Sequence, residues 1–144
     1  HSVISFRSLV ATMSSAEAVR SLLARSEAFL TSARENLSRG LHDVTCFEAD
    51  QAVQIFLKAY VLKLGGSFPR THSLRRILGE LGRLTRKAED VTRFMSENRA
   101  SIIMLEDAYL RSRYAVEGYE PSDAETCLKV AEEVIRFGRT LVEA

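Results

Sequence analysis

The sequence contains no tryptophan, and only two prolines and seven glycines occur among its 144 residues. Proline and glycine interrupt helices more strongly than other residues, so their scarcity favours long helices. The chain shows no strand-like alternation of apolar and polar residues and no internal repeat. A chain of this length forms one domain comfortably. We therefore expect a single all-α domain.

Cysteine and histidine are also scarce, which argues against several kinds of site. Cys46 and Cys127 lack the spacing of a zinc site, and each falls on an apolar helical stripe where cysteine acts as a small hydrophobe. No H-E-x-x-H motif, glycine-rich phosphate loop or G-x-S-x-G motif occurs. We therefore expect no metal and no cofactor. Nothing suggests a disulfide framework, so we expect a reducing, cytoplasmic location.

Long apolar runs and a strong net charge are missing as well. No apolar run approaches the roughly eighteen residues of a membrane-spanning helix, so we expect no membrane partner. The formal net charge is +1, which provides no overall field to attract nucleic acid. Residues 70–99 nevertheless carry eight basic and four acidic side chains. This local excess favours phosphate, although a solvated helix face with mixed charges is the simpler explanation.

The apolar residues that are present recur at helical spacing and predict an up-and-down bundle of four long helices and one shorter helix. The second helix has the cleanest stripe, from Ala49 to Leu64, so we expect it at the centre of the core. The fourth should kink or break between Ser96 and Ser101, because Asn98 falls on its stripe. The first predicted helix spans about 15–39. The second runs from 43 or 45 to 64, and the third from 71 or 73 to between 82 and 85. The fourth spans 88–114 and the fifth 122–142.

Capping residues indicate where these helices begin and end. Ser14 with Glu17, and Ser122 with Glu125, match the S-x-x-E capping box at the start of the first and last helices. Gly40 follows the first helix and can take the left-handed conformation that ends it.

The caps of the next two helices are predicted as alternatives. Asp43 or Thr45 can cap the second helix, and Thr71 or Ser73 can cap the third.

The start of the chain differs from the rest. Its first residue is histidine, and helical patterning begins only after Met13. We expect residues 1–13 to be an N-terminal extension, either disordered or derived from a tag or upstream sequence, and residues 14–144 to be the helical domain.

The segment Tyr109–Tyr114 is the strongest candidate for chemistry. Arg111, Arg113 and Tyr114 combine positive charge with a stacking surface at a helix end, which suits nucleotides. A salt bridge to a neighbouring helix is the alternative role for either arginine. His72 lies at a helix start, where a capping or packing role is simpler than a catalytic one.

Three segments, in this order, resemble motifs of the HEPN domain family. Residues Gln51–Ala59 resemble the Q-A-x-E-x-x-x-K-A pattern, with Gln54 in place of the usual glutamate. Thr71–Leu74 is similar to the T-H-x-L helix start, and Tyr109–Tyr114 resembles the Y-x-x-x-R-Y ending. The agreement in order and spacing covers roughly residues 15–142.

The resemblance implies a bundle of four or five helices that frequently forms a homodimer. It also implies a setting beside a minimal nucleotidyltransferase, often as a prokaryotic toxin–antitoxin pair. Many members are metal-independent ribonucleases with an R-x(4–6)-H motif. No histidine follows Arg111 or Arg113 in this chain, so the usual proton-transfer group is missing. The sequence therefore argues against that catalytic activity.

We expect a dimeric binding module for a nucleotide or RNA. In this interpretation Arg111 and Arg113 contact phosphate, Tyr114 stacks or shapes the cleft, Lys58 adds charge, and Gln54 belongs to the same site.

Two alternatives stay open. The chain could be a pure protein-interaction or antitoxin-type module, such as the helical partner of a nucleotidyltransferase, with an apolar patch left on its isolated surface. It could also be a divergent metal-independent ribonuclease that uses His72 or Glu117 as its base.

Overall fold

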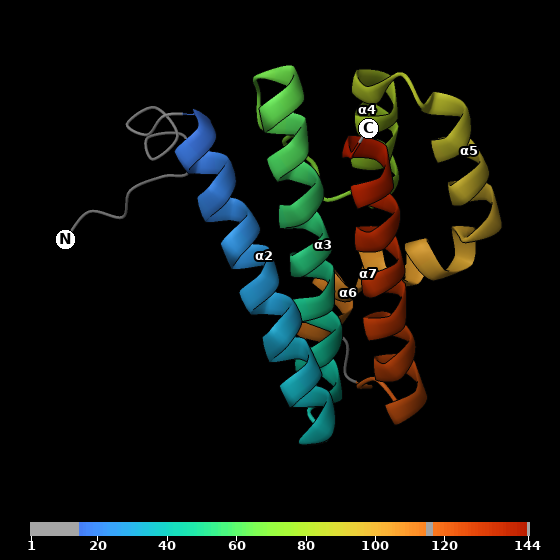
Figure 1. The fold of residues 1–144 in the computed structure, drawn as a ribbon. Helices are drawn as coiled ribbons and strands as arrows, with labels where there is room; N and C mark the ends of the chain where they lie inside the picture. The colour runs from blue at the N-terminus through green and yellow to red at the C-terminus, as the bar shows by residue number, and fades with distance from the viewer. Residues whose placement is uncertain (1–14, 115–116, 144) are drawn as a thin grey trace.

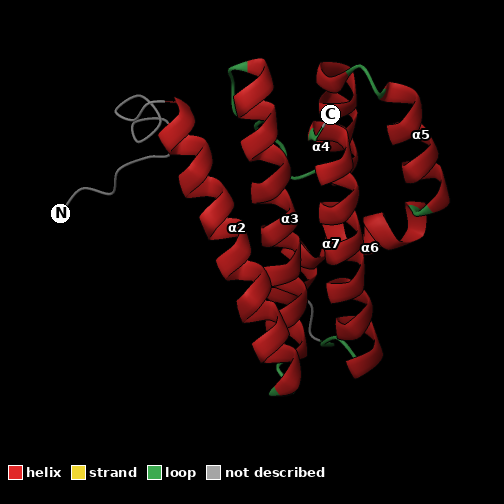
Figure 2. Ribbon diagram, in the orientation of Figure 1, coloured by secondary structure: helices red, strands yellow, loops and turns green. Residues whose placement is uncertain are grey.

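The computed structural model describes residues 15–114 and 117–143, apart from the side chains of Ser112 and Arg113. The predicted N-terminal extension and Ser14 of the first capping box lie outside this part of the chain. Within it, the chain forms six α-helices and no strand, which confirms the all-α prediction (Figure 2).

Three long helices form the body of the bundle. Helices α2 (Ser15–Ser38) and α3 (His42–Gly65) make an antiparallel hairpin, and α7 (Pro121–Val142) lies on the other side of α3 (Figure 1). Helix α3 packs against α2 and α7 and also against α4 and α6. It therefore lies at the centre of the core, as its apolar stripe predicts.

Three shorter helices complete the bundle. Helices α4 (Leu74–Thr85) and α6 (Arg99–Tyr114) both pack against α3 and α7, whereas α5 (Ala88–Glu97) lies at the edge of the molecule (Figure 1). The break between α5 and α6 confirms the interruption predicted at Asn98. The side-chain amide of Asn98 donates to the carbonyl of Phe94 at 2.8 Å. Side chains of this kind compete with the helix for backbone groups, which favours a helix end here.

Capping was predicted correctly for α4 but not for α3. Ser73 caps α4, with its hydroxyl accepting the backbone N–H of Arg76, as expected. The expected caps of α3, Asp43 or Thr45, were wrong: Leu41 occupies the capping position without a side-chain hydrogen bond. The Asp43 carboxylate instead accepts the backbone N–H of Tyr119 at 2.7 Å.

The start of α7 is a second correction. The capping box consists of Glu120 and Asp123, not Ser122 and Glu125, so the helix begins earlier than predicted. Pro121 occupies the first helical position. Proline fits there because its missing N–H would have no partner in the first turn of a helix.

The two cysteines lie in the main hydrophobic core and are fully buried, as predicted. They come from α3 and α7, and the Cys46 thiol lies 3.9 Å from the carbonyl oxygen of Asp123. A hydrogen bond with Cys127 and burial together raise the pKa of the Cys46 thiol well above its usual range. Both residues are free thiols.

None of the helices described combines the length and the apolar content that would be required to cross a membrane.

Candidate functional site

A row of buried polar residues on α3 forms the inner part of the candidate site. Asp50, Gln54 and Lys58 follow one another at intervals of four residues, so they lie on one face of the helix. Their exposed fractions are 0%, 2% and 8%. Polar groups are buried so completely only where hydrogen bonds or opposite charges compensate for the missing hydration.

Gln54 joins this row to the segment that precedes α4. Its side-chain amide donates to the backbone carbonyl of His72 at 2.5 Å and lies 3.4 Å from Asp50 Oδ1. The amide of Gln51 lies 3.5 Å from the other carboxylate oxygen of Asp50. The carbonyl oxygen of Gln54 is buried and has no hydrogen-bond partner among the residues described. Gln54 therefore holds the residues around His72 against α3.

Burial disfavours the charged forms of Asp50 and Lys58. It raises the pKa of Asp50 to about 7, although hydrogen bonds from Gln54 and Gln51 and the positive charge of Lys58 act in the opposite direction. Burial also lowers the pKa of Lys58, against the attraction of Asp50. The Lys58 ammonium lies 5.2 Å from the centre of the Phe68 ring, in the segment between α3 and α4. At neutral pH Asp50 is therefore only partly ionised.

A carboxylate from α6 occupies the N-terminal end of α4. Glu106 accepts the Arg75 guanidinium N–H at 2.9 Å and lies 3.4 Å from the Ser73 hydroxyl. A negative charge is favourable at this end of a helix, where backbone N–H groups lack partners. Glu106 therefore interacts both with the Arg75 guanidinium and with the N-terminal end of α4.

Three aromatic rings from separate parts of the chain stack on one another. The Tyr109 ring of α6 stacks on the His72 imidazole, with 4.2 Å between ring centres and 19° between planes. On α3, the Phe47 ring is also stacked with Tyr109, at 6.3 Å and 27°. Tyr109 and Phe47 are half-buried, whereas His72 is exposed. We call Phe47, Tyr109 and His72 the aromatic ladder.

Arg111 lies two residues beyond Tyr109 and is exposed. Its guanidinium carbon lies 4.9 Å from the centre of the Tyr119 ring, within the range of a cation–π interaction. Tyr119 is only 7% exposed, and its backbone is fixed by the bond to Asp43. Arg111 is therefore held in place while its charge stays accessible to solvent.

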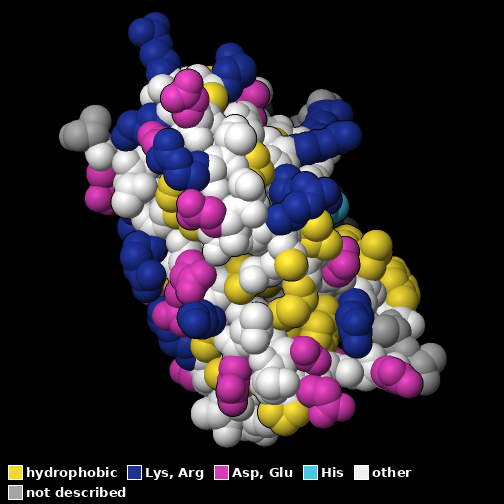
Figure 3. Space-filling view, turned by 90° about the vertical axis from the view of Figure 1, so that its right-hand side faces the viewer, with side chains coloured by type: hydrophobic (Ala, Val, Ile, Leu, Met, Phe, Trp, Pro, Cys, Tyr) yellow, Lys and Arg dark blue, Asp and Glu magenta, His cyan; other side chains and the backbone are white. Residues whose placement is uncertain are grey.

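Tyr114, near the end of α6, is 73% exposed, and Leu110 is 61% exposed. The two residues are four positions apart, so they lie on the same side of the helix. The Arg113 side chain lies outside the described part of the structure. Figure 3 shows hydrophobic side chains gathered on the lower right part of one face of the molecule, with lysine and arginine side chains above them.

The predicted site residues therefore lie at two levels. Arg111 and Tyr114 are at the surface, whereas Gln54 and Lys58 lie beneath it. Contacts link Gln54 through His72 to Tyr109, which lies on the same helix as Arg111 and Tyr114.

Sequence reasoning missed the support that Tyr119 and Asp43 provide. Each lies shortly after a glycine, Gly118 or Gly40, and only the folded chain brings Asp43 and Tyr119 together beneath Arg111.

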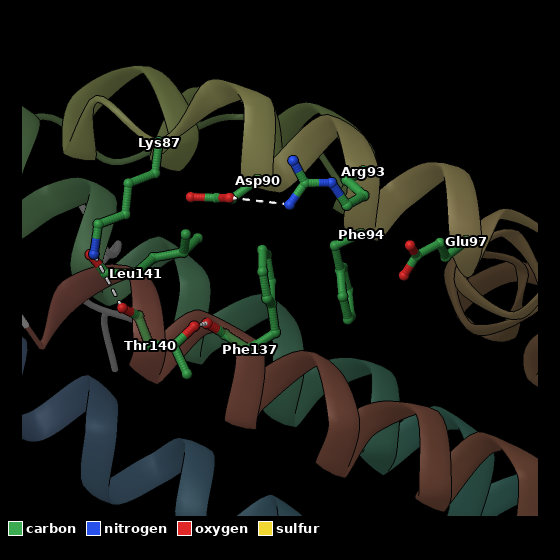
Figure 4. Close-up of a pocket in the computed structure, with 8 residues that line it drawn as sticks. All are labelled: Lys87, Asp90, Arg93, Phe94, Glu97, Phe137, Thr140 and Leu141. Carbon is green, nitrogen blue, oxygen red and sulfur yellow. Dashed lines mark hydrogen bonds and ion pairs between the residues drawn. The ribbon is translucent and has the colours of Figure 1, made fainter.

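A separate groove between α5 and α7 has a volume of about 460 Å³ and contains none of the predicted residues (Figure 4). Phe94 and Phe137 stack across it, with ring centres 4.0 Å apart. The Lys87 ammonium donates to the backbone carbonyls of Thr140 and Leu141. These contacts hold α5 against the end of α7, so we assign the groove a structural role.

Among the residues described, no group of three or more histidine, cysteine, aspartate or glutamate side chains is placed to hold a metal ion.

Comparison with known families identifies the chain. The sequence model of the HEPN domain matches residues 19–141. The chain belongs to the HEPN domain family. No curated protein and no solved structure matches it. HEPN membership associates the chain with helical modules that are often linked to RNA or to toxin–antitoxin systems, and HEPN domains often dimerise.

Proposed function

We propose that this HEPN domain is a dimeric binding module for a nucleotide or RNA. The observation that carries the proposal is the position of Arg111, which is exposed yet supported by the buried Tyr119 ring. A guanidinium held in this way offers paired N–H donors to phosphate at little cost in side-chain entropy.

The remaining predicted residues have distinct parts in this proposal. Arg113 supplies a second phosphate contact, and Tyr114 provides a face on which a base stacks. Gln54 and Lys58 act from below by holding the segment around His72 and Phe68 in place, since both are buried.

Thermal unfolding in the presence of nucleotides and short RNAs tests the proposal. A ligand that binds only the folded state adds roughly 2.7 kcal/mol of stability at about one hundred times its dissociation constant. In a domain of this size we expect a rise of several degrees in the midpoint. Arg111→Ala and Arg113→Ala should abolish most of this rise. Arg136→Ala, which removes an exposed arginine from α7, is the control.

A second candidate function is a protein-interaction module, in which the chain is the helical partner of a nucleotidyltransferase. The exposure of Leu110 and Tyr114 on one side of α6 favours it, because monomeric proteins seldom expose large apolar side chains together without a function. An unchanged midpoint with every ligand at millimolar concentration would contradict the binding module and favour this candidate.

A further inference from the structure

Arg111 is held by an aromatic ring rather than by an acidic side chain. Asp107 lies one turn earlier on the same side of α6, where an aspartate commonly pairs with an arginine four residues later. The two side chains form no ion pair, and Arg111 forms none with any other residue that the structure describes. The guanidinium lies over the Tyr119 ring instead. Its N–H donors are therefore available to a ligand.

The ring of Tyr119, and not its hydroxyl group, makes this contact. The hydroxyl oxygen is buried and has no hydrogen-bond partner within the described part of the chain. A polar group that is buried without a partner lowers stability. The hydroxyl group therefore contributes no hydrogen bond that holds the ring in place, and phenylalanine should be able to replace Tyr119 at this position.

Asp43 ties the backbone of Tyr119 to the start of α3. Its carboxylate accepts the Tyr119 N–H, which lies 76 positions away in the sequence. Aspartate is a preferred capping residue, yet α3 begins at Leu41 without a side-chain cap. The carboxylate is thus used on another segment and not on the end of its own helix. Departures of this kind from local rules are expected at functional sites.

Gly118 leaves the space that the Asp43 carboxylate occupies. A Cβ atom at position 118 would lie 2.9 Å from one carboxylate oxygen and 3.1 Å from the other. Both distances are shorter than a normal contact between carbon and oxygen, which is about 3.3 Å or more. A side chain at this position would therefore push the carboxylate away from the Tyr119 N–H. Gly118, Asp43 and Tyr119 form a series of contacts that ends at Arg111.

From these contacts we propose that Asp43, Gly118 and Tyr119 are positioning residues that orient the Arg111 guanidinium for a phosphate group of a nucleotide or RNA. None of the three has to touch the ligand. Because the arginine side chain is already held in the folded chain, less conformational entropy is lost when phosphate binds. This inference rests on the proposed function, and it assigns part of the phosphate affinity to contacts between α3, α6 and the segment before α7.

Proton NMR of the ligand-free chain tests the contact itself. An aromatic ring shifts the resonances of protons above its face upfield, so the Arg111 Hδ and Hε protons should resonate upfield of those of other exposed arginines. Tyr119→Phe should keep this shift, and Tyr119→Leu should remove it. Asp43→Ala and Gly118→Ala should reduce it. Identical Arg111 resonances in the wild type and in Tyr119→Leu would overturn the proposal.

Fluorescence anisotropy tests the effect on binding, with labelled ATP and a short labelled single-stranded RNA as probes. Tyr119→Leu should weaken binding about three- to tenfold, which is the range of a cation–π contact. Tyr119→Phe keeps the ring and should bind within about twofold of the wild type. Equal weakening by the two variants would show that the ring is not what positions Arg111.

Variants at Asp43 and Gly118 test the rest of the series. Asp43→Ala and Gly118→Ala should weaken binding as Tyr119→Leu does. Asp43→Asn keeps a carbonyl oxygen that can accept the Tyr119 N–H, so it should bind within about threefold of the wild type. Gly79→Ala adds a Cβ atom to open space on α4 and is the control for the glycine substitution. Wild-type affinity in Asp43→Ala would remove Asp43 from the positioning residues.

A double-mutant cycle separates positioning from a general structural effect. If Tyr119 acts through Arg111, Tyr119→Leu should change the affinity by less than about twofold in a chain that already carries Arg111→Ala. Equal weakening with and without Arg111 would mean that the ring affects binding by another route, which overturns the proposal. Circular dichroism of each variant checks that the helical fold is retained. If Tyr119→Leu does not fold, Gly118→Ala takes its place in the cycle.

The binding results also distinguish this inference from the proposed function. If the wild-type chain binds neither probe, the proposed function is contradicted and the positioning role with it. If Arg111→Ala weakens binding but Tyr119→Leu does not, the proposed function stands and the positioning role fails.

Discussion

Asp50 shows how burial governs the chemistry of a single residue in this fold. It is fully buried on α3, and its two amide contacts, at 3.4 and 3.5 Å, are long. The charged form is therefore poorly solvated, which is the main reason that its pKa rises to about 7. The folded state binds a proton here at pH values where the unfolded chain, with an aspartate pKa of about 3.9, has already released it.

This difference predicts how stability depends on pH. Between about pH 4 and 7 the folded state holds more protons at Asp50 than the unfolded state does, so Asp50 makes the free energy of unfolding fall as pH rises. Above about pH 7 the contribution stays constant. Asp50→Asn removes the ionisation, so its stability relative to wild type should increase by a few kcal/mol across this range.

Urea unfolding of both proteins at several pH values measures the change. Asp107→Asn, an exposed substitution on α6, is the control. A difference between Asp50→Asn and wild type that does not vary with pH would show that the Asp50 carboxylate ionises normally in the folded protein.

The same residues show what the sequence can predict at this scale. The helical spacing of Gln54 and Lys58 identifies them as one polar face of α3. It does not reveal that this face is buried, because that depends on α4, α6 and the intervening segment packing over it. The sequence likewise places Arg111 near a helix end, but its support by Tyr119 depends on a contact between separate parts of the fold.

At the scale of helices, apolar periodicity predicts the elements better than their ends. The stripe of α3 and the break at Asn98 follow from local sequence, so both could be predicted. The starts of α3 and α7 could not be predicted in this way. The Asp43 carboxylate accepts a hydrogen bond from Tyr119 in another part of the chain, and Glu120 replaces the expected serine as the cap of α7.

Close packing between α3 and α7 yields a prediction about Gly138. A Cβ atom at this position would lie 2.8 Å from Phe56 Cε1 and 3.3 Å from Leu57 Cδ2. Both neighbours are buried and cannot move aside without disturbing the core. Gly138→Ala should therefore lower the free energy of unfolding by about 1–3 kcal/mol, measured by urea unfolding.

Gly79 on α4 provides the matched control. A Cβ atom there would meet nothing within 4 Å, and the position is exposed. Gly79→Ala should stabilise the protein by roughly 0.5–1 kcal/mol, because alanine favours the helix more than glycine does. If both substitutions stabilise the protein, α7 does not pack against α3 as closely as the structure indicates.

At the scale of the whole molecule, the surface at the end of α6 combines charge with apolar area. Leu110 and Tyr114 are exposed on one side of the helix, while Arg111 lies over Tyr119. HEPN domains often dimerise, and we propose that two copies of this chain associate through the side of α6 that bears Leu110. Such an interface would bury apolar surface and bring two copies of Arg111 close to one another.

Leu110→Glu tests this arrangement, because a buried, unpaired carboxylate is costly at an apolar interface. Light scattering at micromolar concentration should give twice the mass of one chain for the wild type and a single chain mass for the variant. Leu64→Glu is the control: Leu64 is 45% exposed and lies near the C-terminal end of α3, so it should leave the dimer intact. A wild-type chain that is monomeric at this concentration would contradict the dimer. A dimer that survives Leu110→Glu would place the interface on another face, and Arg111 would then act within one chain.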